Sequence, residues 1–143
     1  MHAALDVAWP EFAGQFAGLQ FETPIAILHR WAMPQDLAAA CPRAVQPLVR
    51  KASRNHIAPE RIRSLIESAR ITIALQEGTA ARREEIRRLL ARWEIVRRQL
   101  SDVEGELGEL VDVTRAAKAL LTVPGVNVVC AATLVADLGE PNW

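Results

Sequence analysis

The chain has 143 residues, the size of one typical domain, and its formal net charge at pH 7 is zero. Half of the residues are hydrophobic and 24% are charged, a composition that excludes an intrinsically disordered chain. The sequence has no apolar run near ~18–20 residues and carries Asp6 close to its start, so we expect neither a membrane span nor a signal peptide, and a cytoplasmic location.

The zero net charge hides a strong separation of charge along the sequence. Residues 1–42 carry one arginine against four acidic residues, and residues 43–98 carry fourteen basic residues against six acidic ones. Residues 99–112 carry five acidic residues and no basic one. A basic middle segment favours a polyanionic partner, but a solvated helical surface explains the same pattern equally well.

The first half of the chain predicts a cluster of short helices, without strand signals. Thr23 and Pro24 are expected to be the N-cap and the first residue of a helix that continues to Trp31. Pro47 follows another proline closely, so it either sits in a first turn or ends that helix. The prolines expected to open further helices are Pro34, Pro42 and Pro59.

After Pro59, apolar residues recur at a spacing of three to four, which predicts one buried face of a helix. The segment from Gln76 to Thr79 is then expected to break the chain before the next helix. We therefore expect residues 1–78 to form a helical subdomain in an all-α protein. The residues of the predicted buried face are Ile62, Leu65, Ile66, Ala69 and Ile73.

A heptad repeat begins near Ala80 and gives the clearest pattern in the chain. With Ile86 at position a, all a and d positions are apolar over four heptads, which is typical of a coiled coil. An amphipathic helix of a globular core is the less favoured alternative, because the repeat is so long. We expect one paired helix over residues 79–115, with these oligomerisation residues: Ile86, Leu89, Trp93, Val96, Leu100, Val103, Leu107 and Leu110.

The charges beside this repeat indicate the direction of pairing. A parallel pair would place Arg92 against Arg97 of its partner. An antiparallel pair would instead place Arg97 against Glu104, and Arg92 against Glu106. We therefore expect a homo-oligomer that forms through an antiparallel coiled coil, with the ion pairs selecting the orientation.

Residues 116–143 contain Leu-Leu-Thr-Val-Pro-Gly-Val-Asn followed by an alanine-rich stretch, which resembles a helix-hairpin-helix element. Pro124 is expected to end the first helix, and Gly125 to permit a tight turn. The N–H groups that start the second helix would then suit a phosphate oxygen. Asn127 stands where the usual motif has a glycine, and it can either adopt a left-handed conformation or cap the helix. A hairpin used only for packing would show the same pattern.

We predict a nucleic-acid interface made from this hairpin and from basic residues of the middle segment. Two glutamate–arginine spacings in the long helix, Glu84 with Arg88 and Glu94 with Arg98, also predict simple ion pairs. The predicted nucleic-acid-binding residues are Arg50, Lys51, Arg54, Lys118, Gly125, Val126 and Asn127. The arginines that would extend this surface are Arg82, Arg83, Arg87, Arg88, Arg97 and Arg98.

The ordered set of segments resembles the middle, and the start of the C-terminal region, of insertion-sequence-110/116/902 family transposases. The likeness covers nearly the whole chain and rests on the order of its blocks. These blocks are Trp9-Pro10-Glu11-Phe12, the 23–31 helix, residues 33–40, residues 48–54, the 60–70 helix, the coiled coil, residues 120–126 and residues 131–140.

The resemblance implies a DNA recombinase that acts as an oligomer and, in some members, is guided by a structured RNA. It also implies an acidic, divalent-metal-binding domain before this region and a nucleophilic serine after it. We therefore assign to this chain no catalytic residue, no metal site and no cofactor. The serines Ser53, Ser64, Ser68 and Ser101 lie in the wrong region to match that nucleophile. Cys41 and Cys130 lack a metal-binding or disulfide spacing.

Two functional hypotheses follow, and both exclude a membrane partner. In the first, the chain is a nucleic-acid-binding and oligomerising fragment of a transposase, with DNA or a guide-type RNA as its partner. In the second, it is a helical coiled-coil assembly module that ignores nucleic acid. An intact enzyme ranks third, because no nucleophile, base and orienting group converge. We expect the chain to be organised in three segments, which are residues 1–78, 79–115 and 116–143.

Overall fold

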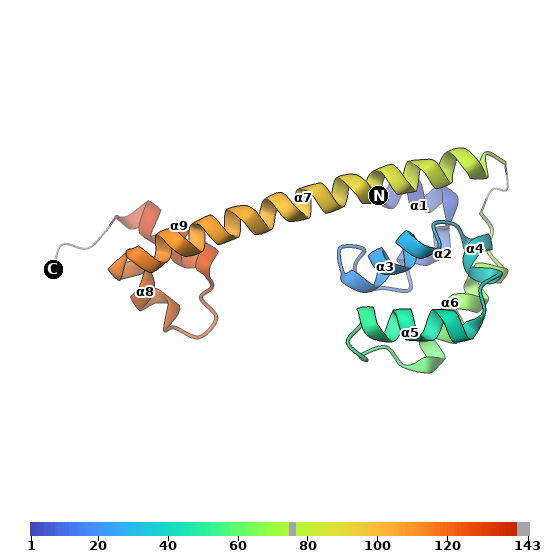
Figure 1. Cartoon of the computed structure of the whole chain (residues 1–143), viewed down its shortest axis with the longest axis horizontal. Coiled ribbons are helices and arrows are strands. Elements are labelled where there is room, and N and C mark those ends of the chain that lie inside the picture. The colour runs from blue at the N-terminus through green and yellow to red at the C-terminus, as the bar shows by residue number, and fades with distance from the viewer. Residues whose placement is uncertain (75–76, 140–143) are drawn as a thin grey trace. The chain divides into compact units, whose positions relative to one another are not determined.

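The computed structural model describes residues 1–74 and 77–139, and within these ranges it contains nine α-helices and no strand (Figure 1). The prediction of an all-α fold is thus confirmed. The chain divides into two compact units, the first spanning Met1–Arg92 and the second beginning at Trp93. This division falls inside the longest helix, whereas the sequence suggested limits after residues 78 and 115.

The first unit holds six short helices and the start of a long one. Its helices are α1 (His2–Ala8), α2 (Pro10–Ala13), α3 (Glu22–Arg30), α4 (Pro34–Ala38), α5 (Pro42–Ala52), α6 (Pro59–Arg70) and the first part of α7 (Thr79–Val113). The second unit holds the rest of α7, together with α8 (Arg115–Leu121) and α9 (Val128–Leu138). The long helix expected from the heptad repeat is therefore present.

Aromatic and aliphatic side chains from several helices form the core of the first unit. Trp9 and Phe12 are fully buried, and their ring centroids lie 4.6 Å apart. The face of α6 packs against α2, α4 and α5, while α3 packs against α5. Burial of each large apolar side chain stabilises the fold by about 1.5–3 kcal/mol, so this shared core holds the short helices together.

Proline marks the starts of three helices as predicted, since Pro34, Pro42 and Pro59 each occupy the first turn of a helix. Both expectations for Pro47 are wrong: it neither lies in the first turn of a helix nor ends one, because α5 continues through it to Ala52. A proline inside a helix lacks one donor and costs about 3 kcal/mol. Val45 and Val49, on either side of Pro47, are both buried, and their burial offsets this cost.

The predicted cap at Thr23 is wrong. The helix α3 begins at Glu22, its N-cap is Phe21, and no side chain caps it. Thr23 is 7% exposed and belongs to the buried face of the helix. Packing of this face therefore decides where α3 begins, and the local capping preference does not.

The buried face of α6 is confirmed for four of its five predicted residues, which are Ile62, Leu65, Ile66 and Ala69. Ile73 is 82% exposed, so its assignment to this face is wrong. The physical reason is that α6 ends at Arg70, after which the helical spacing no longer applies. Of the predicted break, Gln76 lies outside the described residues, and Gly78 has a φ of +70° just before α7.

The second unit has a small core. Its buried side chains among the described residues are Val111, Ala117 and Ala131, one from each of α7, α8 and α9. The two alanines are small enough to let α8 and α9 pack closely. Partly buried residues around this core are Leu120, Leu121, Val126, Val128, Ala132 and Val135. Across the described ranges, none of the helices is both long enough and apolar enough to cross a membrane.

Candidate functional site

The predicted hairpin is present between α8 and α9. The helix α8 ends at Leu121, three residues before Pro124, and the Val126 N–H donates to the Val123 carbonyl at 3.1 Å to close a turn. Gly125 has a φ of +89°, a conformation that L side chains rarely adopt, so glycine is needed there. No described atom lies within 4 Å of a Cβ placed on Gly125, so this need comes from the backbone and not from crowding.

Asn127 resolves the two alternatives that the sequence left open. Its φ of −99° and ψ of 176° are extended, and it is the N-cap of α9. Its side-chain Oδ1 accepts a hydrogen bond from the Cys130 N–H at 2.8 Å. Asn127 therefore acts as a helix cap, which leaves the first N–H groups of α9 directed away from the helix.

The available donors of the hairpin are backbone N–H groups. Among the described residues, no acceptor faces the N–H of Gly125 or Asn127, nor those of Val128 and Val129 at the start of α9. The Val126 N–H is different, because it is already used in the turn, and its side chain packs on the core. Sequence reasoning included Val126 and missed Val128 and Val129, which the N-cap at Asn127 would have indicated.

The basic residues expected to bind phosphate belong to different units. Arg50 and Lys51 occupy the last turn of α5, and Arg54 lies in the turn that follows. This turn is fixed by left-handed backbone at Arg54 and Asn55, and by the Asn55 N–H, which donates to the Arg50 carbonyl at 2.8 Å. All three basic side chains are exposed, and within the described part of the chain none has an ion-pair partner. We call Arg50, Lys51 and Arg54 the basic turn.

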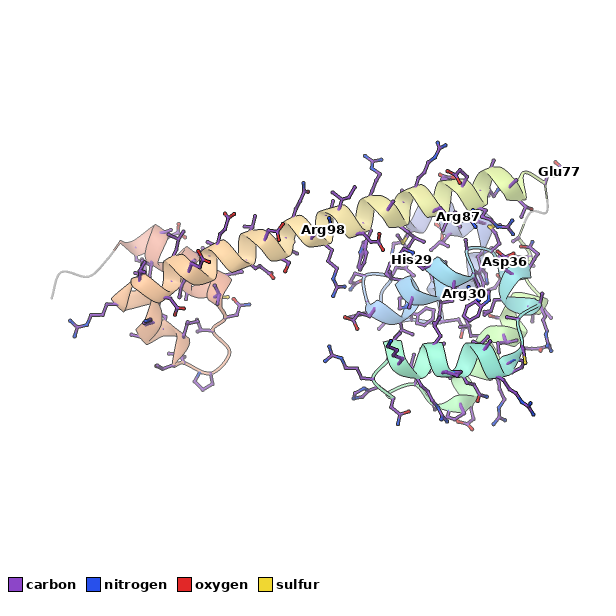
Figure 2. All side chains as sticks on the ribbon, viewed as in Figure 1. His29, Arg30, Asp36, Glu77, Arg87 and Arg98 are labelled. Atoms are coloured by element: carbon purple, nitrogen blue, oxygen red, sulfur yellow. The ribbon has the colours of Figure 1, made fainter. Side chains whose placement is uncertain are left out.

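Lys118 belongs to the second unit, where it is exposed in the last turn of α8. A cation at this end of a helix is also favourable for the helix dipole alone. Arg87, in the first unit, and Arg98, in the second, are both exposed on α7, and Figure 2 shows the two side chains projecting from that helix.

The other predicted arginines of α7 already have partners. Arg83 Nη2 donates to Asp36 Oδ1 of α4 at 2.6 Å, and Arg88 pairs with Glu84 at 3.1 Å, as its spacing predicted. Arg82 donates to the Glu77 carbonyl, and Arg97 lies 5.1 Å from the Trp93 ring centroid. Within the described residues, Arg98 does not form the expected pair with Glu94. These contacts serve the fold, so we give these arginines little weight in a binding surface.

The heptad positions are not equivalent in the structure. Ile86 is fully buried in the first unit, beside Leu90, a core residue that the heptad assignment did not include. Ile86 is therefore committed to packing within the chain, and this side chain is not available at an interchain interface. Leu89, Trp93 and Leu107 are partly buried. The remaining heptad residues are exposed: Val96, Leu100, Val103 and Leu110.

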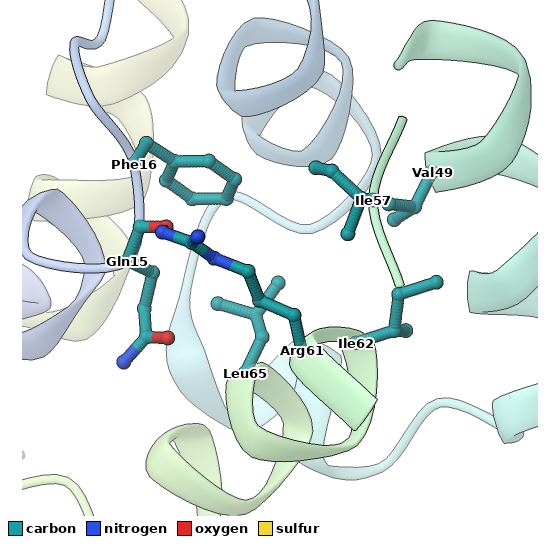
Figure 3. Close-up of a pocket in the computed structure, with 7 residues that line it drawn as sticks. All are labelled: Gln15, Phe16, Val49, Ile57, Arg61, Ile62 and Leu65. Carbon is teal, nitrogen blue, oxygen red and sulfur yellow. The ribbon is translucent and has the colours of Figure 1, made fainter. Parts of the chain in front are cut away.

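A small pocket in the first unit is unsuited to ligand binding. Arg61 reaches from α6 toward Gln15 and Phe16, and its Nη2 donates to the Gln15 carbonyl at 2.7 Å (Figure 3). The pocket holds about 10 Å³, at the lower limit for a single water molecule. Its other lining residues are apolar, so it is a packing defect of the core: Val49, Ile57, Ile62 and Leu65.

Three surfaces therefore remain as functional candidates: the hairpin with its open N–H groups, the basic turn and the exposed heptad residues. Over residues 1–74 and 77–139, the structure gathers no cluster of three or more histidine, cysteine, aspartate or glutamate residues that could hold a metal ion. Comparison of the chain with protein-family models, curated proteins and solved structures found no match.

Proposed function

We propose that this chain is the nucleic-acid-binding and self-associating part of a DNA transposase. The observation that carries the nucleic-acid part is the hairpin, in which N–H groups at Gly125, Asn127, Val128 and Val129 lack acceptors among the described residues. A short row of such donors at the start of a helix suits a phosphate oxygen and carries no base readout. The resemblance of the ordered blocks to insertion-sequence-110/116/902 family transposases supplies the reaction context of this proposal.

The basic turn supports the same proposal through charge. Phosphate neutralisation dominates the affinity of proteins for nucleic acid, and it requires exposed cations that are not already paired. Arg50, Lys51 and Arg54 meet this requirement. The unit Met1–Arg92 carries thirteen of the seventeen basic residues and nine of the seventeen acidic ones, so its net charge is +4.

Binding of a labelled DNA duplex, followed by fluorescence anisotropy at several salt concentrations, tests the basic turn. The triple variant Arg50→Gln, Lys51→Gln, Arg54→Gln should bind more weakly. The slope of log K against log salt should become shallower by about 0.9 for each phosphate that the variant no longer neutralises. The matched control is Arg63→Gln with Arg70→Gln, which removes two exposed arginines that already pair with Glu60 and Glu67. The triple variant removes three charges and the control removes two, so an equal change of slope per removed charge would contradict a specific role for the basic turn.

A second substitution tests the hairpin donors directly. Val128→Pro removes one N–H at the first position of α9, where proline is well tolerated and where the preceding Asn127 already has extended backbone. Removing one hydrogen bond to a charged oxygen, about 1.5 kcal/mol, should weaken DNA binding about tenfold. Val128→Ala is the control for the missing side chain. If both variants bind DNA as tightly as the natural chain, the hairpin serves packing only.

The second candidate function is a helical assembly module that does not bind nucleic acid. The charge of the second unit favours it, since residues 93–139 carry four basic residues against seven acidic ones. Acidic side chains repel phosphate, which works against the hairpin as a contact. A chain that self-associates but fails to bind duplex DNA or structured RNA at low salt would establish this alternative.

A further inference from the structure

The part of α7 that belongs to the second unit leaves an apolar stripe uncovered. Val96 and Leu110 are each 62% exposed, Leu100 is 57% exposed and Val103 is 52% exposed. Half-buried Trp93 and Leu107 complete the stripe at the same heptad spacing. These six side chains lie along one side of the helix, and we call them the seam. A continuous apolar face of this kind marks an interaction surface.

We infer that the seam is covered by a second copy of the same helix, running in the opposite direction, in one defined register. The inference rests on the proposed self-association and names its partner and geometry. A second copy is the occupant because the charges beside the seam complement themselves when the helix is reversed. From Arg92 to Arg98 the helix carries three arginines and one glutamate, and from Asp102 to Asp112 it carries five acidic residues and no basic one.

Burial of Ile86 restricts the register. Ile86 is 0% exposed and Leu90 is 1% exposed, so both belong to the core of the first unit. An interchain contact that used Ile86 would have to remove it from that core. The seam between copies therefore begins at Trp93 and ends at Leu110.

In an antiparallel pair, each a position faces a d position of the other helix. The register that buries all six seam residues is symmetric about a point between Ser101 and Asp102. If the contact region moved one heptad toward the N-terminus of the helix, Ile86 would have to become a contact residue. If it moved one heptad toward the C-terminus, Trp93 and Val96 would stay uncovered. Each facing pair occurs twice: Trp93 with Leu110, Val96 with Leu107, and Leu100 with Val103 of the second copy.

The flanking charges favour this register over a parallel pair. It places Arg97 beside Glu104 of the second copy, whereas Arg92 and Glu106 lie about 7.5 Å apart along the helix axis and do not pair in this register. A parallel pair would instead place Arg92 beside Arg97, which is repulsive. Exposed ion pairs contribute little to affinity, so they select the orientation while the seam supplies the apolar contact.

Disulfide cross-linking of the full chain tests the orientation, with Cys41 and Cys130 first replaced by serine. In the inferred register Val96 faces Leu107 of the second copy. The two copies of Val96 are eleven residues apart along the helix axis, which is about 16 Å. Val96→Cys alone should therefore form no covalent dimer under mild oxidation. Mixing Val96→Cys with Leu107→Cys should give one. A covalent dimer from Val96→Cys alone would overturn the antiparallel arrangement.

Charge reversal gives a second, independent readout through the dimer dissociation constant, measured by sedimentation. Glu104→Arg should weaken the dimer about three- to tenfold, because the symmetric dimer contains two contacts between position 104 of one copy and Arg97 of the other. Adding Arg97→Glu should restore the dimer. In a parallel pair, Arg97→Glu alone would strengthen association, because it would face Arg92, so the sign of this single change separates the two orientations.

The outcomes distinguish this inference from the proposed function. A chain that stays monomeric at the highest concentration tested would overturn both the inference and the proposed self-association. A parallel dimer would overturn the inference alone. DNA binding by a dimer whose seam behaves as described would support both, and absence of DNA binding with an unchanged seam would count only against the nucleic-acid proposal.

Discussion

Glu11 and Thr72 are hydrogen-bonded across sixty residues of sequence. The Thr72 hydroxyl donates to Glu11 Oε2 at 2.7 Å, and the Ile73 N–H donates to Glu11 Oε1 at 2.9 Å. This one carboxylate therefore ties α2 to the segment that follows α6. Burial acts to raise the pKa of Glu11, but the donors from Ile73, Thr72 and its own N–H outweigh it and hold the pKa below its usual value.

The lowered pKa of Glu11 predicts acid sensitivity of the first unit. A carboxyl group with a lower pKa in the folded state stabilises that state above the pKa of the unfolded chain. This stabilisation is lost as the pH falls through the folded-state pKa. Glu11→Gln should destabilise the chain at pH 7 by about 1–2 kcal/mol and should reduce the drop in Tm between neutral and acidic pH. Asp6→Asn, at an exposed position, is the control, and an unchanged Tm profile in Glu11→Gln would contradict the role of this tie.

Asp36 and Arg83 form a long-range ion pair in the first unit (Figure 2 labels Asp36). Each side chain is about one-third exposed, so the pair should contribute close to 1 kcal/mol, at the upper end for exposed pairs. A double-mutant cycle with Asp36→Asn and Arg83→Met, measured by urea denaturation, should give a coupling energy of this size. The coupling should shrink at high salt, because a partly exposed pair is screened. A coupling near zero would show that α4 is held to α7 by apolar contacts alone.

Features that depend on local chemistry could be read from the sequence. Prolines at 34, 42 and 59 begin helices because their fixed φ and missing donor suit a first turn. Gly125 adopts positive φ in the predicted turn, and Asn127 caps α9, which is one of the two roles that the sequence left open. The length of α7 followed from an uninterrupted apolar repeat.

Features that depend on tertiary packing could not be read in this way. The heptad repeat alone cannot tell Ile86, which the first unit buries, from Val96, which stays exposed, because both occupy equivalent positions. The continuation of α5 through Pro47 depends on buried Val45 and Val49. The partner of Arg83, 47 residues earlier in the chain, has no local signal at all.

The cap of α9 gives a prediction about the hairpin that is independent of any ligand. Asn127→Ala removes the acceptor of the Cys130 N–H and should destabilise the second unit by about 1 kcal/mol. Asn127→Asp keeps an acceptor at the same place and should restore most of this stability. Hydrogen exchange at Cys130 and Ala131 measures the effect locally, and equal protection in both variants would show that α9 is held by packing on Ala117 instead.

Gly105 and Gly108 predict where α7 can be strengthened. Both lie inside the helix, and no described atom lies within 4 Å of a Cβ placed on either of them. Alanine at each position should therefore stabilise the helix by about 1 kcal/mol through the lower conformational freedom of the unfolded chain. Circular dichroism should show a higher Tm for Gly105→Ala and Gly108→Ala, with the two increases adding.

These two glycines lie off the heptad seam, so their replacement also separates helix stability from pairing. If the helix of the second unit is ordered only when paired, a more stable single helix lowers the entropy cost of association. The double variant should then dimerise more tightly, while the cross-linking pattern of Val96 with Leu107 stays the same. A higher Tm with a weaker dimer would show that glycine at 105 or 108 makes a close approach to the other chain, as small residues do where helices contact tightly.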